Sequence, residues 1–472
     1  MGGLYGAQGP LFTKMRRIAV ALALAGAAVA GAIVLASKGS PAASGLSWTA
    51  PASVAACGPA LEPRVVFPYS APNVRSGAGA IVWLARCDGR TIDAAVLGGN
   101  DQPSAAGPLT RGAAAHVELS APLATAGTTR GQIVAVAGAH GEAMLGDGFA
   151  RAGIDKLRVL RGDGSPVATQ VGFIGDVDVA TVRRRGAGYA IVLLAQRHFQ
   201  HRFGRPLRLA AGPARPSALV LAMDFRADRL VIWDAAGELY ARYVTNDGRV
   251  ARRQKLGPAG YAPQVSAVLS DDDRAFVLWS DEPPPGVAGT ARVLLAHSAF
   301  GPRFHGARTL SLLREPPDLR LTAGAVAAER LSSEGVALLW PAMSGSGDLV
   351  LDAAGATTGG VQPPSVVSLP GQDVRLGAVA TGPDDEVVAL VEVAPRRATG
   401  FDFSRQAIYA IRSNVVRQPD GLGFGALGEL AAPGPNSAPS VAVDPDSDRA
   451  VAVWQTLVSR KPGIEWSVGA RS

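Results

Sequence analysis

One hydrophobic pattern recurs along the chain from about residue 60 onward. A short run rich in β-branched residues, often preceded by proline, is followed by a polar turn and then by a second, almost wholly apolar run. Proline cannot donate to a strand ladder, so it suits the first residue of a strand. An uninterrupted apolar run of this length predicts a strand that is covered on both faces. The pattern therefore predicts repeated β-hairpins, most clearly over residues 216–233, 262–279 and 438–454.

Each hairpin is followed by two further runs. After Trp279, which ends one apolar run, come a third run at Ala291–His297 and a more polar fourth run at Arg308–Leu312. The repeating unit is thus predicted to be four strands, with the inner strands buried and the outer ones progressively wetter. Looser copies lie at 321–340, 374–391 and 176–194, and the weakest copy lies at 132–145.

The spacing of the copies predicts the architecture. The residues that end each second run step along the chain by about 53 residues, and a four-stranded unit of this period is typical of a propeller blade. We expect an all-β fold consisting of one β-propeller with eight four-stranded blades, or seven if residues 127–175 are an embellishment. An open β-solenoid or a pair of sandwiches is the alternative, but solenoid repeats are usually shorter and sandwiches do not repeat one tryptophan register. The aligned positions are Trp83, about 145, about 193, Trp233, Trp279, Trp340, about 391 and Trp454.

The ends of the repeat region predict how the ring closes. The last copy holds only three runs, the third being Gly463–Gly469, and a spare run, Pro63–Phe67, precedes the first copy. The first strand of the first copy is expected at Ala71–Val74. We therefore expect Pro63–Phe67 to be the outer strand of the last blade, so that pairing between the two chain ends leaves no blade incomplete.

The N-terminal region predicts export. Lys14, Arg16 and Arg17 precede an apolar run, Ile18–Ala36, that is just long enough to cross a bilayer as a helix. The positive flank places that end in the cytoplasm and the rest of the chain outside. We expect a cytoplasmic segment at 1–17, one apolar helix at 18–36, a linker at 37–60 and the propeller at 61–472. The helix is either a retained transmembrane anchor or a cleaved signal peptide, so the protein is membrane-anchored or secreted, and translation starts at Met1 or Met15.

Two cysteines, Cys57 and Cys87, lie on the predicted outer side. A pair in an oxidising compartment predicts one disulfide, worth about 3–4 kcal/mol in the loop-entropy view. Two unpaired thiols are the alternative. The run Val54–Cys57 also resembles a lipidation motif, but it begins too far beyond the apolar run for that reading.

The charge of the chain does not indicate nucleic-acid binding. The net charge is +7 with a pI of about 9.7, and arginine supplies most of the positive charge. The basic clusters at 183–185, 252–253 and 396–397 are scattered along the sequence and lack interleaved stacking aromatics. We therefore expect no nucleic-acid partner.

The repeat resembles that of a broad class of exported bacterial propeller proteins. Residues 438–454 are similar to their pattern x-P-x-V-A-V-D-x-x-G-x-A-V-V-A-W, and the resemblance extends over residues 63–472. It implies the fold and not an activity, because propellers serve as enzymes, lectins and scaffolds alike.

Several aspartates and histidines are of the types that bind metal ions. Asp444, Asp446 and Asp448 alternate as in calcium loops but lack the central glycine and the distal glutamate, so we interpret them as a solvated turn that caps its own backbone. His198 and His201 lack a third zinc ligand nearby and are read as an exposed loop. The remaining histidines are isolated in the sequence and are interpreted as ordinary surface or core residues: His116, His140, His297 and His305.

A glycosidase would require two carboxylates that face each other across a cleft. Asp176, Asp178 and Asp373 lie near predicted innermost strands, as does Arg375. Nothing in the sequence shows that they converge. We therefore expect a binding or scaffold protein without a cofactor that recognises a protein, glycan or cell-envelope ligand through a face of the ring, with a propeller-type glycoside hydrolase as the alternative.

Overall fold

The computed structural model contains no helix in the part of the chain that it describes, and its strands are antiparallel throughout the named sheets. Among these residues no helix has the length and hydrophobicity needed to cross a membrane. The predicted apolar helix at 18–36, Cys57 and Cys87 lie outside the described residues, which are 46–54, 59–68, 79–86, 90–98, 102–104, 107–108, 119–127, 132–139, 142–149, 153–161, 167–171, 177–196, 203–270, 274–284, 287, 289–298, 303–315, 326–331, 335–357, 360–396, 401–413, 422–458 and 461–471.

Strands that follow one another in the chain pair into successive sheets, each begun by a new first strand. The first four sheets have four strands each. The first holds β3 (Ala60–Val66), β4 (Ala80–Arg86), β5 (Arg90–Val96) and β6 (Gly107–Pro108); the second β7 (Leu119–Gly127), β8 (Gln132–Ala139), β9 (Glu142–Phe149) and β10 (Gly153–Arg161); the third β11 (Val167–Val171), β12 (Val177–Arg185), β13 (Gly188–Ala195) and β14 (Leu207–Gly212); the fourth β15 (Leu219–Met223), β16 (Arg229–Ala235), β17 (Glu238–Val244) and β18 (Gln254–Pro258).

Four more sheets follow in the described part of the chain, and two of them have a split outer edge made of two short strands. The fifth holds β19 (Val265–Leu269), β20 (Ala275–Asp281), β21 (Gly289–Ser298) and β22 (Arg308–Glu315); the sixth β23 (Ala327–Arg330), β24 (Val336–Met343), β25 (Leu349–Thr357), β26 (Gly360–Val361) and β27 (Ser365–Val367); the seventh β28 (Gln372–Thr381), β29 (Val387–Pro395), β30 (Gln406–Arg412) and β31 (Gly428–Gly434); the eighth β32 (Ser437–Val443), β33 (Ala450–Val458) and β34 (Lys461–Arg471) with β1 (Leu46–Trp48) and β2 (Ala52–Val54).

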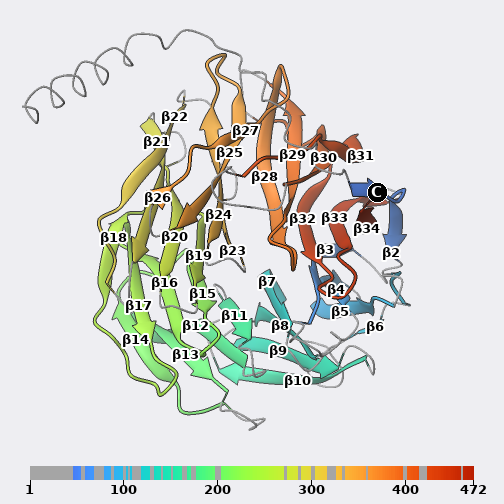
Figure 1. Ribbon diagram of the computed structural model, residues 1–472. Helices are drawn as coiled ribbons and strands as arrows, with labels where there is room; N and C mark the ends of the chain where they lie inside the picture. Colours follow the sequence, from blue (N-terminus) through green and yellow to red (C-terminus); the bar gives the residue numbers. More distant parts are fainter. Residues whose placement is uncertain are drawn as a thin grey trace, which may run out of the picture. The chain divides into compact units, whose positions relative to one another are not determined.

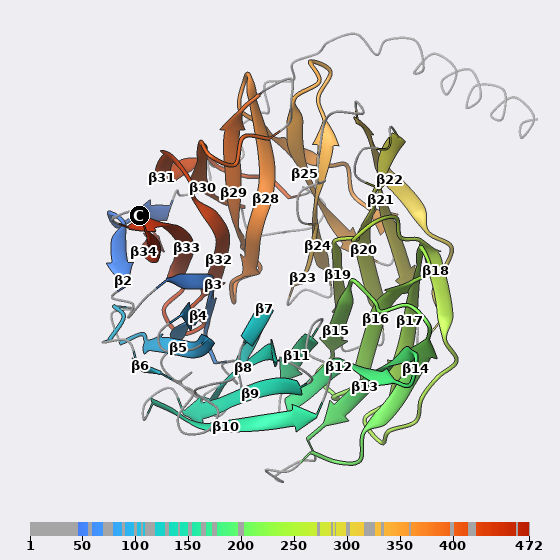
Figure 2. The same cartoon turned by 180° about the vertical axis from the view of Figure 1, so that it is seen from behind.

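The first strands of these sheets stand around a common centre (Figures 1 and 2). Each contacts the first strand of the next sheet, from β3 through β7, β11, β15, β19, β23, β28 and β32, and β32 contacts β3 again. A closed circuit of antiparallel sheets is a β-propeller, which confirms the predicted all-β propeller fold. It also excludes the open solenoid and the pair of sandwiches.

The repeated tryptophan occupies one structural position. Each lies on the second strand of its sheet and is almost completely buried, in a core cluster shared with the preceding sheet. Trp279, for example, packs beside Gly257 and donates a hydrogen bond from Nε1 to the carbonyl of Pro258, both on the outer strand β18. The expected packing of tryptophan between neighbouring blades is therefore confirmed at Trp83, Trp233, Trp279, Trp340 and Trp454.

The ring closes through the N-terminal segment, but not through the predicted run. Pro63–Phe67 is not the outer strand of the last sheet, because Pro63 to Val66 belong to β3, the first strand of the first sheet. Its alternating side chains explain this position: Val65 packs with the eighth sheet and Val66 with the second sheet. Both faces of β3 are therefore covered by neighbouring sheets, one on each side. The first strand expected at Ala71–Val74 lies outside the described residues.

The strands that complete the eighth sheet are β1 and β2, within the stretch interpreted as a linker. Both pair with β34, so Leu46 lies opposite Arg471 and Ala52 opposite Trp466. The Thr49 hydroxyl accepts a hydrogen bond from the Val468 amide at 3.0 Å. The indole of Trp48 lies so close to Gly469 that a Cβ atom there would come within 2.8 Å of it.

Two sequence copies were misaligned by one strand. Residues 145 and 193 were each expected to end a second strand, yet they lie on β9 and β13, the third strands of the second and third sheets. The copies at 132–145 and 176–194 have neither the proline nor the tryptophan that marks the clearest copies. Residues 127–175 contribute β8 to β11 to two regular sheets.

Candidate functional site

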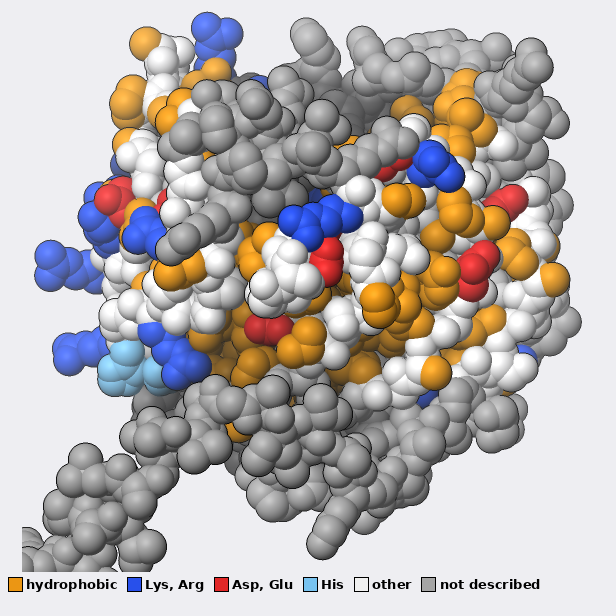
Figure 3. All heavy atoms as spheres, turned by 90° about the horizontal axis from the view of Figure 1, so that it is seen from above, with side chains coloured by type: hydrophobic (Ala, Val, Ile, Leu, Met, Phe, Trp, Pro, Cys, Tyr) orange, Lys and Arg blue, Asp and Glu red, His pale blue; other side chains and the backbone are white. Residues whose placement is uncertain are grey.

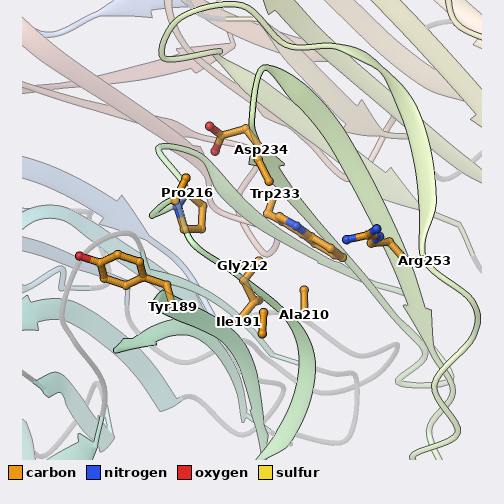
Figure 4. Close-up of a pocket in the computed structure, with 11 residues that line it drawn as sticks. Tyr189, Ile191, Ala210, Gly212, Pro216, Trp233, Asp234 and Arg253 are labelled. Atoms are coloured by element: carbon orange, nitrogen blue, oxygen red, sulfur yellow. The ribbon is translucent and has the colours of Figure 1, made fainter. Parts of the chain in front are cut away.

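A shallow pocket opens between the third and fourth sheets (Figure 4). Its base is made of small residues from the end of β14 and the connection to β15, and larger side chains rise on both sides. The small residues leave backbone and apolar surface accessible to a ligand. The pocket is lined by Tyr189, Ile191, Ala210, Ala211, Gly212, Ala214, Pro216, Trp233, Asp234, Ala235 and Arg253.

Trp233 and Arg253 belong to one wall of the pocket, and both contact the ring of Tyr240, which is not itself a lining residue. Trp233 on β16 lies directly opposite Tyr240 on β17, and their rings stack at 6.1 Å between centroids. The guanidinium carbon of Arg253 lies 4.6 Å from the centroid of Tyr240. Such a contact stabilises by about 0.5–1 kcal/mol at an exposed site. Because Trp233 is only 2% exposed, the wall is anchored in the core and holds the exposed Arg253 in place.

The opposite wall comes from the third sheet. Tyr189 lies near the start of β13, just after a tight turn in which Gly186 has a φ of 58°, a conformation that favours glycine. Across the strand pair Tyr189 faces Arg184, and the guanidinium carbon of Arg215 lies 6.0 Å from its ring. Tyr189 and Arg253 thus face the pocket from its two sides (Figure 4).

The charge around the pocket is predominantly positive. Arg184, Arg215 and Arg253 are exposed. Burial and, to a smaller extent, the charge of Arg253 lower the pKa of Arg242 on β17. The lining contains one carboxylate among its described residues, that of Asp234.

Asp234 serves the backbone. Its Oδ1 accepts hydrogen bonds from the amides of Ser217 and Ala218 at 2.7 and 2.6 Å, and its Oδ2 accepts one from the Ser217 hydroxyl at 2.8 Å. Both oxygens are therefore occupied, and glycoside hydrolysis of the two-carboxylate kind would need a second carboxylate across the pocket. The arrangement suits binding of an anionic ligand, with an aromatic ring and guanidinium donors to contact it.

The sequence did not reveal this convergence. The clusters at 183–185 and 252–253 are scattered along the sequence and lack interleaved aromatics, but in space Arg253 lines the pocket and contacts Tyr240, and Arg184 lies opposite the lining residue Tyr189. A signal was present, because the turn at 186–187 places Tyr189 opposite Arg184 in a simple hairpin register.

Of the carboxylates considered for hydrolysis, the two that are described lie in different sheets and serve different partners. Asp178 lies on β12 in the third sheet and accepts a hydrogen bond from Nε of Arg229 on β16. Asp373 and Arg375 lie on β28 in the seventh sheet. Asp373 accepts a hydrogen bond from the Leu349 amide at 2.9 Å, and burial raises its pKa. Asp176 lies outside the described residues.

The alternating aspartates form a self-capped turn, as expected. Asp444 accepts hydrogen bonds from the Asp446 amide at 3.0 Å and, through its carbonyl, from the Asp448 amide at 2.9 Å. Asp448 also approaches Asp384 and Glu386 of the seventh sheet, with carboxylate oxygens within 4.8 Å of one another.

A guanidinium group neutralises this acidic cluster. Arg412 Nη2 lies 3.2 Å from Glu386 and 3.8 Å from Asp448. Burial and the neighbouring Asp448 raise the pKa of Glu386 to about 6. Arg412 supplies the positive charge that a bound cation would provide, so we interpret the cluster as an ionic contact between the seventh and eighth sheets.

Two histidines that were interpreted as isolated, His297 and His305, lie side by side. The rings of His297 and His305 are 5.2 Å apart, and the His305 amide donates to the carbonyl of His297. Burial, His305 and Arg308 lower the pKa of His297. Figure 3 shows the pair in pale blue beside basic side chains. This positive setting disfavours a cation. His116, His140, His198 and His201 lie outside the described residues.

No protein-family model and no curated protein sequence matches the chain. Solved structures similar to it include a protein of unknown function from Dyadobacter fermentans, with 10% identity, 91% and 100% coverage of the two chains and a TM-score of 0.42. The Dos1 propeller has 8% identity, 90% and 95% coverage and a TM-score of 0.48. An ulvan lyase of polysaccharide lyase family 25, bound to -[GlcA(1-4)Rha3S]-, has 11% identity, 81% and 97% coverage and a TM-score of 0.42. The resemblance to exported bacterial repeat proteins has no support from a sequence family, and the fold assignment rests on the sheet topology of the chain itself.

Proposed function

We propose that this protein is an exported, eight-bladed β-propeller that binds a polysaccharide carrying carboxylate groups, and that the pocket between the third and fourth sheets contacts it. The observation that carries this proposal is that three exposed arginines surround one aromatic-lined pocket: Arg253 lines it, and Arg184 and Arg215 lie beside the lining residue Tyr189. Guanidinium groups match the planar fork of a carboxylate. The half-buried ring of Tyr189 offers an apolar surface against which a sugar ring can lie.

The proposal is for binding and not for hydrolysis. The carboxylate of Asp234 is engaged with the amides and hydroxyl of residues 217–218. Around the centre of the ring, the partly exposed residues of the first strands include small and apolar ones such as Ala168, Val220, Ser266 and Ala378. A pair of facing carboxylates with a free path to a substrate would be needed for a glycosidase.

Binding of the full chain to polygalacturonate, with neutral dextran as the comparison, tests the proposal. We expect saturable binding to polygalacturonate that weakens as the salt concentration rises, because exposed charges are screened. Arg253→Gln and Tyr189→Ala should each weaken binding by about tenfold, corresponding to a loss of about 1.4 kcal/mol. Arg303→Gln, which removes an exposed arginine of the fifth sheet, is the matched control and should bind as the parent does.

Equal binding to dextran, or equal losses in the pocket variants and in Arg303→Gln, would show that the pocket is not the contact. Binding of polygalacturonate only through the general positive charge would likewise give no difference between Arg253→Gln and Arg303→Gln.

A further inference from the structure

Arg375 holds an unusual position on the first strand of the seventh sheet, far around the ring from the pocket described above. Its guanidinium carbon lies 4.8 Å from the ring centroid of Phe401 and 4.9 Å from that of Phe403. The two rings are 5.2 Å apart in an edge-to-face arrangement. Both phenylalanines belong to the connection between β29 and β30, so this connection holds the guanidinium against aromatic surface.

Two donor nitrogens of this arginine form no hydrogen bond within the described residues. Nε and Nη1 are buried, and neither has a hydrogen-bond partner in the described part of the chain. Guanidinium groups that serve the fold are ordinarily hydrogen-bonded, as Arg229 is to Asp178 and to the carbonyl of Thr245. Buried donors without acceptors are costly, so an acceptor from beyond the described residues is expected.

The neighbouring carboxylates favour the protonated form of Arg375 but accept no hydrogen bond from its Nε or Nη1. Burial lowers its pKa, whereas the carboxylates of Glu392 and Glu282 raise it. Glu392 lies directly across the strand pair, but its Oε1 accepts a hydrogen bond from Gln406 at 3.3 Å. Burial also raises the pKa of Glu392. Arginine itself stays charged under all ordinary conditions.

We infer that Arg375 binds the carboxylate of a small ligand or chain end whose apolar group packs on Phe403. Nε and Nη1 donate on different sides of the planar guanidinium, and each forms a carboxylate-matching fork with Nη2, so a carboxylate would engage one of the two buried donors together with Nη2. Phe403 is 52% exposed although it contacts the buried arginine, so it extends an apolar surface from the donors to the solvent. A ligand with a carboxylate next to an aromatic or aliphatic group would fill both parts. This site is separate from the one in the proposed function.

The test uses benzoate, which carries both groups, with acetate and benzyl alcohol as probes that each lack one of them. Titration of the full chain, followed by NMR line broadening of the probe, should show benzoate binding at least fivefold more tightly than either comparison probe. Arg375→Met should reduce benzoate binding at least tenfold, and Phe403→Ala should reduce benzoate binding but not acetate binding. Arg405→Gln, which removes an exposed arginine of the same connection, should change nothing.

Two further measurements separate binding from a role in folding. Arg375→Met should keep or raise the melting temperature, because it replaces an unsatisfied buried charge by an apolar chain of similar length. Glu392→Gln should tighten benzoate binding by removing a repulsive charge. A marked fall in the melting temperature of Arg375→Met, equal binding of benzoate and benzyl alcohol, or weaker binding by Glu392→Gln would each overturn the inference.

Discussion

The ion pair between Asp178 and Arg229 joins the third and fourth sheets, the same two sheets that form the pocket. The side chain of Asp178 is fully buried and that of Arg229 is 6% exposed. Arg229 also donates from Nη1 to the carbonyl of Thr245 at 3.3 Å. Bringing two charges out of water is expensive, and their attraction repays it only while both are present. We therefore expect the pair to be strongly coupled.

Removing one partner should cost far more than removing both. Asp178→Leu or Arg229→Met leaves one buried charge alone, for which about 3–5 kcal/mol is expected. The double variant replaces the pair by apolar groups and should lie within about 2 kcal/mol of the parent. The coupling energy in a double-mutant cycle would then be at least about 4 kcal/mol, well beyond the additive behaviour of independent sites.

The measurement is urea unfolding at neutral pH for the parent, both single variants and the double variant, followed by fluorescence of the buried tryptophans. Trp233 lies on the same strand as Arg229 and reports on these two sheets. If a single variant lost less than about 1 kcal/mol, or if the two losses simply added in the double variant, the pair would not be the buried and coupled contact described here.

Three other results are expected. The pKa of Glu386 in the folded state (about 6) lies above its ordinary value of 4.5, so the folded state binds this proton more tightly than the unfolded state does. The free energy of unfolding should therefore fall by about 2 kcal/mol as the pH rises from about 4.5 to about 6. Urea titrations at several pH values measure this slope, and Glu386→Gln should abolish it. Gly469→Val should displace Trp48 from the closing strand and expose β1 to limited proteolysis, whereas unchanged protection would mean that this contact does not hold the closure. Intact-mass measurement with and without reduction, on protein from its native host, should show a two-proton difference for a Cys57–Cys87 disulfide and, at the same time, reveal whether the N-terminal segment is cleaved.

The disulfide between Cys57 and Cys87 remains a prediction, because both cysteines lie outside the described residues.

The sequence predicted those strands whose burial on both faces produces a continuous apolar run. Second strands such as β20 are covered on both faces, so each of their seven residues is buried and the run is continuous. The closing strands β1 and β2 have three residues each and are mostly exposed or half-buried. Their position is fixed by β34, a partner about 420 residues away, and no local pattern records such pairing. The same holds for the pocket, whose walls come from different sheets.

The residues that build the ring and the residues that offer chemistry occupy different parts of the repeat. The tryptophans recur because each must fill the same space against the preceding sheet, and substitution there would open a cavity in every case. Tyr189 lies on a third strand, β13, and Arg253 directly precedes a fourth strand, β18, so both lie outside the hairpin of first and second strands that the sequence repeat marks at 262–279 and 438–454. Arg375 lies in a copy that has lost its tryptophan. In a repeat fold, we expect ligand contacts at the positions where one copy differs from the others. Identical copies would present eight equivalent surfaces. The departures from the repeat are therefore the most informative places to mutate, and the polygalacturonate and benzoate titrations examine two of them independently.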